Sequence, residues 1–247
     1  MTTFLRDTAT VFTRELRPSL RNPAAMLFDM GQPLLFLFLF GSLLGGAVGP
    51  SWQWFVPGIL VMMCLTGPMS SGYTLLVELI GGAMERMMVT PLSRTAMLIG
   101  KSMKAVVTLV VQAVLIIVLA LPLGFELHAA GVLAGLAQLA IFGVGLGALS
   151  FVLAMKSVPS GTLFYVVSQS LLFPLLLLSG VLLPLETAPG WLKVLGQINP
   201  VTYIVDAQRA LFAGNLAAPS VLYGTLTACV VAAIGLYLGN RAMSKGL

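Results

Sequence analysis

The sequence predicts an all-α membrane protein, and two features of its composition support that class. Hydrophobic residues make up 58% of the 247 residues and charged residues only 9%, whereas an average soluble domain carries roughly 25% charged residues. The apolar stretches are long and continuous, without the alternation of period two that a membrane β-barrel requires. Because lipid offers no hydrogen-bond partners to the backbone, stretches of this kind are expected to cross a membrane as helices.

Charge-free stretches locate the expected spans. A charge at the bilayer centre costs about 2.5–3.5 kcal/mol on the insertion scale, and a crossing helix needs about 20 residues. The charge-free stretches are 30–77, 105–125, 127–155, 157–185 and 210–240. The first is long enough for two spans, which the turn-forming Gly49-Pro50-Ser51 separates. The sequence therefore predicts six transmembrane helices, at about 24–48, 55–77, 102–121, 130–154, 162–183 and 220–238.

Lysine and arginine residues fall almost entirely on one side of these spans. Eleven of the 13 lie in the N-terminal segment, in the connection between the second and third spans, at Lys156 or in the C-terminal tail. The opposite side carries Lys193 and Arg209. Positive residues concentrate in cytoplasmic loops, so both termini are expected in the cytoplasm. The same bias accounts for the net charge of +5 without a nucleic-acid partner.

Residues 3–17 have the pattern of an amphipathic helix that does not cross the membrane. Leu5, Ala9, Phe12 and Leu16 share one helical face. Arginine and threonine residues cover the other, and Pro18 is expected to end the helix. We expect this interface helix to lie at the cytoplasmic surface of the bilayer. A simple membrane-surface anchor explains the same pattern.

The connection between the second and third spans, about 78–101, mixes charged residues with methionines. Met84, Met87 and Met88 lie beside Glu85 and Arg86. Exposed methionines among charges are typical of a surface that docks a partner. The alternative is a solvated loop whose methionines dip into lipid.

The connection between the fifth and sixth spans, about 184–219, is unusually apolar for an external loop. Trp191, Leu192, Leu195 and Ile198 recur at helical spacing before the break at Asn199-Pro200. Apolar backbone at membrane depth must form its own hydrogen bonds, so short half-inserted helices are expected here. An amphipathic external cap without a gating role is the alternative.

Polar side chains form one stripe on each of two predicted spans. Such stripes avoid lipid and face other helices or a cavity. Hydrogen bonds between helices explain them equally well. The stripes comprise Thr66, Ser70, Tyr73 and Thr74 in the second span, and Thr162, Tyr165, Gln169 and Phe173 in the fifth.

Sequence signatures of catalysis were sought and not found. The chain has no His-Glu-x-x-His or Gly-x-Ser-x-Gly segment, and its one histidine, His128, is expected at the surface. It lacks a Gly-x-x-x-x-Gly-Lys-Ser/Thr loop, so ATP would have to bind a separate subunit. No acidic residue falls in the middle of a span, which disfavours an ion-coupled carrier. Gly-x-x-x-Gly spacings at 41/45, 131/135 and 143/147 indicate close helix packing, most simply within the chain.

Two blocks of residues resemble the ABC type-2 exporter permeases, most closely the daunorubicin-resistance and nodulation-type branch. The resemblance extends over essentially the whole chain, although Gly81-Gly82-Ala83 is less charged than the family pattern. The first block is Glu85-Arg86-Met87-Met88-Val89-Thr90-Pro91-Leu92-Ser93-Arg94, followed by Gly100-Lys101; the second is Leu178-Ser179-Gly180, Pro184, Asn199-Pro200-Val201-Thr202-Tyr203, Asp206 and Arg209.

The resemblance implies one transmembrane domain over 1–247, with an interface helix at 3–17, a coupling helix at 81–94 and external re-entrant helices at 184–209. Two such subunits would form the pathway, as a homodimer or heterodimer with the first and fifth spans near the seam. Two ATP-binding subunits, which hold ATP and Mg²⁺, would complete the exporter in the plasma membrane of a prokaryote. The implied ATPase-coupling residues are Glu85, Arg86, Thr90, Pro91 and Arg94, and the implied external gate is Asn199, Pro200, Tyr203, Asp206 and Arg209.

The function expected from these features is ATP-driven export of an amphiphile such as a hydrophobic drug or antibiotic. Thr66, Ser70, Tyr73, Tyr165, Gln169 and Phe173 are the expected pathway residues, because mixed apolar and hydroxyl surface suits such a compound. Export of a lipid-linked glycan or lipo-oligosaccharide is the alternative, and a channel or carrier without an ATPase is a third. This chain itself is expected to have no enzymatic activity and no cofactor.

Overall fold

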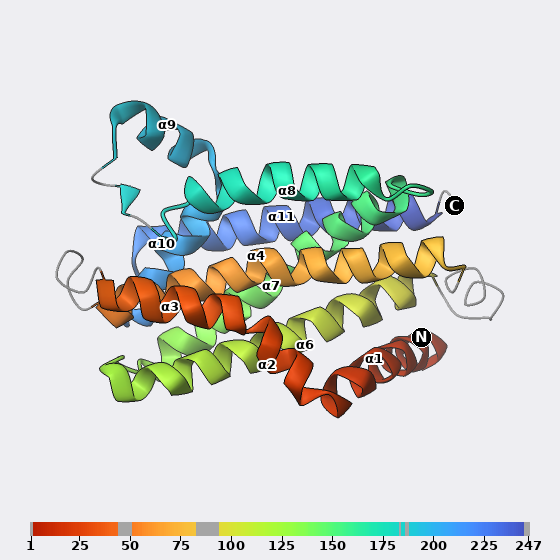
Figure 1. The fold of residues 1–247 in the computed structure, drawn as a ribbon, viewed down its shortest axis with the longest axis horizontal. Coiled ribbons are helices and arrows are strands. Elements are labelled where there is room, and N and C mark those ends of the chain that lie inside the picture. The colour runs from red at the N-terminus through yellow and green to blue at the C-terminus, as the bar shows by residue number, and fades with distance from the viewer. Residues whose placement is uncertain (1, 44–50, 83–93, 183, 186–187, 245–247) are drawn as a thin grey trace.

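The computed structural model describes residues 2–43, 51–82, 94–182, 184–185 and 188–244, and regular structure within these ranges is helical. Most helices run along the long axis of the molecule, side by side (Figure 1). Four are long and apolar enough to cross a membrane, and the shorter apolar segments Leu27–Leu43 and Thr162–Leu177 accompany them. The four long helices are α4 (Ser51–Ile80), α6 (Arg94–Ala120), α7 (Ala129–Lys156) and α11 (Pro219–Ser244).

The amphipathic N-terminal segment forms α1 (Thr2–Arg21), which packs against α6 at one end of the bundle (Figure 1). Val11 is buried in this contact. The helix continues through Pro18, four residues beyond the expected end. Only the last turn follows the proline, so few backbone hydrogen bonds are disturbed. Whether α1 lies at a membrane surface remains a prediction.

The first expected span, 24–48, is interrupted, which corrects the prediction of one continuous helix. Its described part consists of α2 (Pro23–Asp29) and α3 (Gly31–Leu43), separated at the fully buried Met30. Pro33 follows three residues later, and a proline both lacks an N–H and clashes with the preceding turn. The interruption therefore has a local cause in the sequence.

The fifth span is also shorter than expected. Helix α8 (Thr162–Leu177) ends six residues before the expected boundary at residue 183. Gly180 follows with a φ of 74°, a left-handed conformation that glycine adopts without strain. The chain thus turns at Gly180 instead of continuing the helix.

Two short helices, α9 (Gly190–Ile198) and α10 (Pro200–Phe212), connect α8 to α11. Helix α10 packs against α4, α7 and α11, with Val201, Ile204 and Val205 buried. Helix α9 stands off the end of the bundle, and Trp191 and Ile198 remain exposed (Figure 1). The short helices expected between the last two spans are present, but their insertion into a membrane is untested.

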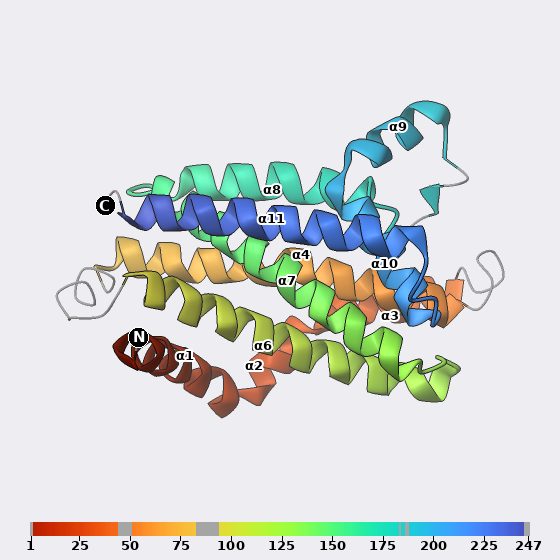
Figure 2. The same ribbon diagram turned by 180° about the vertical axis from the view of Figure 1, so that it is seen from behind.

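Helix α7 crosses the bundle diagonally and contacts α4, α6, α10 and α11 (Figure 2). Glycines permit these close approaches. A Cβ at Gly131 would collide with the carbonyl of Leu211 in α10, and one at Gly145 would lie 2.7 Å from the Cα of Ala232 in α11. The Gly131 contact agrees with the interpretation that the Gly-x-x-x-Gly spacing serves packing within the chain.

The two ends of the bundle carry different elements. Helix α1, the C-terminal end of α11, the end of α4 and the start of α6 lie at one end, whereas α9 and α10 lie at the other (Figure 1). Lys156 ends α7 and Arg241 lies in the last turn of α11, both at the α1 end. The segregation of basic residues that the sequence predicts is therefore compatible with the three-dimensional arrangement.

The packing of α7 on α11 can be tested with two alanine substitutions. Gly145→Ala should lower the melting temperature of the detergent-solubilised protein, because overpacking costs about 1–3 kcal/mol. Gly147→Ala is the matched control, since a Cβ there has no atom within 4 Å and alanine favours a helix. Equal melting temperatures for the two variants would contradict the close contact.

Candidate functional site

Three charged side chains meet where α1, α4 and α6 come together. The ammonium of Lys101 on α6 donates to Glu15 of α1 at 3.0 Å and to Glu78 of α4 at 2.8 Å. The Lys101 side chain is only 8% exposed, so its charge depends on these two carboxylates. This charge cluster of Glu15, Glu78 and Lys101 fixes α1 to two helices that are far apart in the sequence.

Gly100, next to the cluster, allows α1 to approach α6 closely. A Cβ at this position would lie 2.8 Å from a methyl of Val11 and 3.1 Å from the carbonyl oxygen of Thr8. The Gly100-Lys101 pair thus combines a close approach with an ionic attachment. Sequence reasoning noted the pair through the family resemblance but did not predict its partners.

The expected ATPase-coupling residues lie mostly outside the described part of the chain. Glu85, Arg86, Thr90 and Pro91 fall between α4 and α6, within 83–93, and Arg94 is the first residue of α6. The charge cluster joins the two helices on either side of this connection. The coupling role of Glu85, Arg86, Thr90, Pro91 and Arg94 stays a prediction.

The expected pathway residues separate into two groups in the structure. Tyr73 of α4 and Tyr165 of α8 are in contact, with ring centroids 5.6 Å apart, and both are substantially exposed. Gln169 and Phe173 continue the exposed side of α8. Thr66 and Ser70 instead line a cavity with other helices. The structure thus brings the two aromatic residues together, and it places the two hydroxyl residues elsewhere along the same face of α4.

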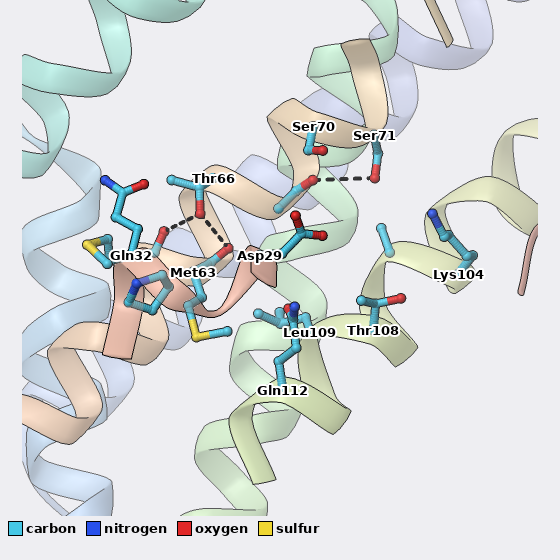
Figure 3. Close-up of a pocket in the computed structure, with 14 residues that line it drawn as sticks. Asp29, Gln32, Met63, Thr66, Ser70, Ser71, Lys104, Thr108, Leu109 and Gln112 are labelled. Atoms are coloured by element: carbon cyan, nitrogen blue, oxygen red, sulfur yellow. Dashed lines mark hydrogen bonds between the residues drawn. The ribbon is translucent and has the colours of Figure 1, made fainter. Parts of the chain in front are cut away.

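The cavity that contains Thr66 and Ser70 lies between the α2–α3 junction, α4 and α6 (Figure 3). Its volume is about 240 Å³. Asp29 and Gln32 reach it from the interruption between α2 and α3, while Lys104, Thr108 and Gln112 reach it from α6 (Figure 3). Sequence reasoning did not predict this site, although the charges at 29 and 104 next to charge-free stretches were its visible signal.

The expected external gate residues form the junction between α9 and α10. Asn199 is buried and caps α10, accepting from the N–H of Val201 at 3.0 Å and donating to the carbonyl of Leu175 at 2.8 Å. Pro200 occupies the first helical position, where its missing N–H costs nothing. The hydroxyl of Tyr203 donates to the carbonyl of Gln197 at 2.8 Å. The end of α8 is thereby attached to the start of α10.

Arg209, near the end of α10, attaches this region to α4. Its guanidinium lies 3.6 Å from the ring centroid of Trp54 and donates to the carbonyl of Gly180 at 2.7 Å. Planar stacking with simultaneous donation suits arginine and not lysine. Asp206 lies three residues earlier and is exposed. These contacts describe a rigid junction, and a gating movement is not tested by them.

Buried amides connect α10 to the centre of the bundle. The Gln208 side chain is fully buried and donates to the carbonyl of Gly135 and to the side chain of Gln138, which in turn donates to Thr225. His128, expected at the surface, is instead half-buried, with Nδ1 3.1 Å from the carbonyl oxygen of Phe212. The expectation for His128 was wrong because α10 folds back beside the start of α7.

A helical bundle whose described residues include four helices long and apolar enough to cross a membrane indicates a multi-pass membrane protein. The chain belongs to the ABC-2 type transporter family, whose family model matches residues 6–213. It is therefore the transmembrane subunit of an ABC transporter. The resemblance stated from the two sequence blocks is confirmed.

Curated relatives agree with this assignment. The daunorubicin resistance ABC transporter permease protein DrrB1 of Streptomyces coeruleorubidus is 29% identical over 203 residues, covering 78% of this chain and 70% of the relative. The putative transport permease ycf38 of Cyanophora paradoxa is 29% identical, covering 78% and 69%. The probable multidrug ABC transporter permease YbhR of Escherichia coli K12 is 27% identical, covering 65% of this chain and 44% of that protein.

The charge cluster generates a stability prediction. Lys101→Met should destabilise the protein by on the order of 3 kcal/mol, because it leaves Glu15 and Glu78 together without a cation. Adding Glu15→Gln and Glu78→Gln should recover most of the loss, since the uncompensated charges are then gone. Thermal melting of the purified variants measures both effects. Lys156→Met, at an exposed residue ending α7, is the control. A triple variant no more stable than Lys101→Met would contradict the ionic role.

Proposed function

We propose that the chain is the permease of an ATP-driven exporter that moves an amphiphilic compound, such as a hydrophobic drug or antibiotic, across a prokaryotic plasma membrane. The observation that carries the proposal is the exposed surface of Tyr73, Tyr165, Gln169 and Phe173 on α4 and α8. Aromatic and amide groups that the described helices leave exposed suit a ligand held mainly by apolar contact and oriented by a few polar groups. We call these four residues the α4–α8 surface.

A second copy of the permease would cover the α4–α8 surface. Helix α8 packs against α4 and α7. Its exposed side includes Leu163, Val166 and Leu177. Side chains of this size suit a contact between two subunits, with the polar positions facing the seam. We propose a dimer, homomeric or heteromeric, whose pathway lies along this seam, and two ATP-binding subunits that contact its cytoplasmic end.

Energy from ATP would enter at the end of the bundle that carries α1. Membership in the ABC-2 family implies an ABC ATP-binding subunit as partner. Helix α4 ends at Ile80, two residues after Glu78, and α6 begins at Arg94, seven residues before Lys101. A displacement of the connection between α4 and α6 would therefore be transmitted to α1, α4 and α6 together, because the charge cluster links these three helices. Residues 81–94, with Glu85, Arg86, Thr90, Pro91 and Arg94, remain the proposed contact with the ATPase.

At the opposite end, α9 and α10 would form the external gate. Asn199 connects α10 to α8, Tyr203 connects it to α9, and Arg209 connects it to α4. Separation of α8 from α4 would therefore move α10 as well. Export of a lipid-linked glycan is the second candidate, favoured by the exposed Trp191 of α9, since indoles stack on sugar rings as on other flat apolar faces.

The proposed export function is tested by reconstituting the permease with its ATP-binding partner subunit. Amphiphilic drugs should stimulate ATP hydrolysis, and Tyr165→Ala or Gln169→Ala should change which compounds are effective while basal hydrolysis persists. Tyr223→Ala, at an exposed tyrosine of α11, is the matched control and should leave the compound range unchanged. Loss of thermal stability with an unaltered range would show that α4–α8 residues serve only packing.

The proposed orientation places both termini, α1 and Arg241 in the cytoplasm and Lys193 outside, with six spans formed by α2–α3, α4, α6, α7, α8 and α11. Single cysteines can be placed at Lys193 or Arg241, in a background where Cys64 and Cys229 are replaced by alanine. Each variant is then treated with an impermeant maleimide. In intact cells, Lys193→Cys should react and Arg241→Cys should react only after permeabilisation. The reverse pattern would overturn the orientation.

A further inference from the structure

Polar side chains of the cavity between α2–α3, α4 and α6 lack partners within the described chain. Asp29 and Lys104 form no ion pair with each other or with another described residue. Gln32, Thr108 and Gln112 likewise make no hydrogen bond to a described residue. Thr66 and Ser71, by contrast, donate to carbonyls of their own helix. The cavity therefore presents a carboxylate, an ammonium and two amides that no described residue pairs with.

Polar side chains without partners are unusual at the depth in the membrane that this cavity reaches. Lys104 lies three residues beyond Lys101 along α6, or about 4.5 Å, and Gln112 lies eleven residues beyond it, or about 16 Å. The hydrocarbon core of a bilayer is about 30 Å thick. The polar lining thus extends from the level of the charge cluster to roughly the middle of the membrane. Unsatisfied polar groups at such depth mark a site that water or a ligand occupies.

The composition of the cavity specifies the chemistry of its occupant. The carboxylate of Asp29 accepts hydrogen bonds from an ammonium group, and the ammonium of Lys104 donates to an anionic oxygen. Figure 3 shows these two side chains entering from different walls, Asp29 from the α2–α3 junction and Lys104 from α6. A head group that carries both charges can pair with the Asp29 carboxylate and the Lys104 ammonium at the same time.

The size of the cavity limits how much of a ligand it encloses. Its volume of about 240 Å³ is below the roughly 300–1,000 Å³ of sites that enclose a drug-sized molecule. A head group fits, whereas an apolar tail has to remain outside. Because Asp29, Gln32 and Ser70 are exposed, the cavity is open to its surroundings. A single copy of the chain forms it, separately from the α4–α8 surface.

We propose that this cavity binds the zwitterionic, ammonium-bearing head group of an amphiphile, with the ammonium at Asp29, the anionic oxygen at Lys104 and the tail in the surrounding lipid. A two-chain membrane lipid with an ethanolamine phosphate head has this chemistry, and so does a single-chain amphiphile that enters as cargo. Binding of either requires neither ATP nor the proposed export function.

The proposal is tested by native mass spectrometry of the full-length protein in mild detergent. Phosphatidylethanolamine and hexadecyl phosphoethanolamine are the probes, with phosphatidylcholine and hexadecyl phosphocholine as matched ligands that lack ammonium N–H donors. Wild-type protein should bind the ethanolamine forms at least about tenfold more tightly, because charge-assisted hydrogen bonds are lost with the methylated head. Co-purified phosphatidylethanolamine that resists delipidation would identify a resident lipid, whereas binding of the single-chain probe alone would identify a cargo.

Two variants on opposite walls connect this binding to the cavity. Asp29→Asn should abolish the preference for the ethanolamine head, because it removes the partner of the ammonium N–H groups. Lys104→Gln should weaken binding of the ethanolamine and choline forms alike, because both carry the anionic oxygen that Lys104 contacts. The controls Asp7→Asn on α1 and Lys156→Gln at the end of α7 change the same charges elsewhere and should preserve both the preference and the affinity. If one cavity variant is not recovered as a monodisperse protein, the binding measured with the other variant tests the proposal. Equal binding of ethanolamine and choline forms to the wild type would overturn the proposal. So would an unchanged preference in folded Asp29→Asn, or an unchanged affinity for both forms in folded Lys104→Gln.

Discussion

Inside a membrane, polar groups have no water to bond with, and this constraint explains most of the contacts described above. The fully buried amide of Gln208 is held by Gly135 and Gln138, and Arg209 places its charge on Trp54 and on the carbonyl of Gly180. Asn199 both caps α10 and donates to α8. Each group is attached to a helix distant in sequence, because only such a partner removes the cost of burial.

Two places in the structure do not satisfy this need of polar groups for partners within the membrane. The α4–α8 surface and the cavity beside Asp29 both expose polar groups that the described chain does not cover. They differ in kind: the first is broad, aromatic and nearly free of charge, and the second is small and carries one charge of each sign. A broad apolar face suits a variable amphiphile or a second subunit, whereas fixed opposite charges suit a defined head group.

The ends of the bundle are built for different tasks. At the α1 end, one buried lysine joins three helices through ionic contacts, with Gly100 allowing the close approach. At the other end, α10 is wedged between α4, α7 and α11 by apolar packing and amide hydrogen bonds. Ionic contacts tolerate proximity to water and a docking partner, whereas the apolar packing of α10 excludes water from that end of the bundle. This asymmetry suits the proposed exporter, which would be powered from one side and opened on the other.

The sequence by itself determined the class, the approximate spans and the family, because composition, charge-free stretches and the Glu85 and Asn199 blocks are local signals that need no partner. It did not indicate the interruption between α2 and α3, because 24–48 was expected as one helix. The tertiary structure alone decided which polar residues meet. Lys101 gives no sign that it will contact Glu15 and Glu78, and the stripe of α4 does not reveal that Thr66 and Tyr73 face different neighbours. Those choices follow from how helices cross in space, which the periodicity of a single helix does not contain.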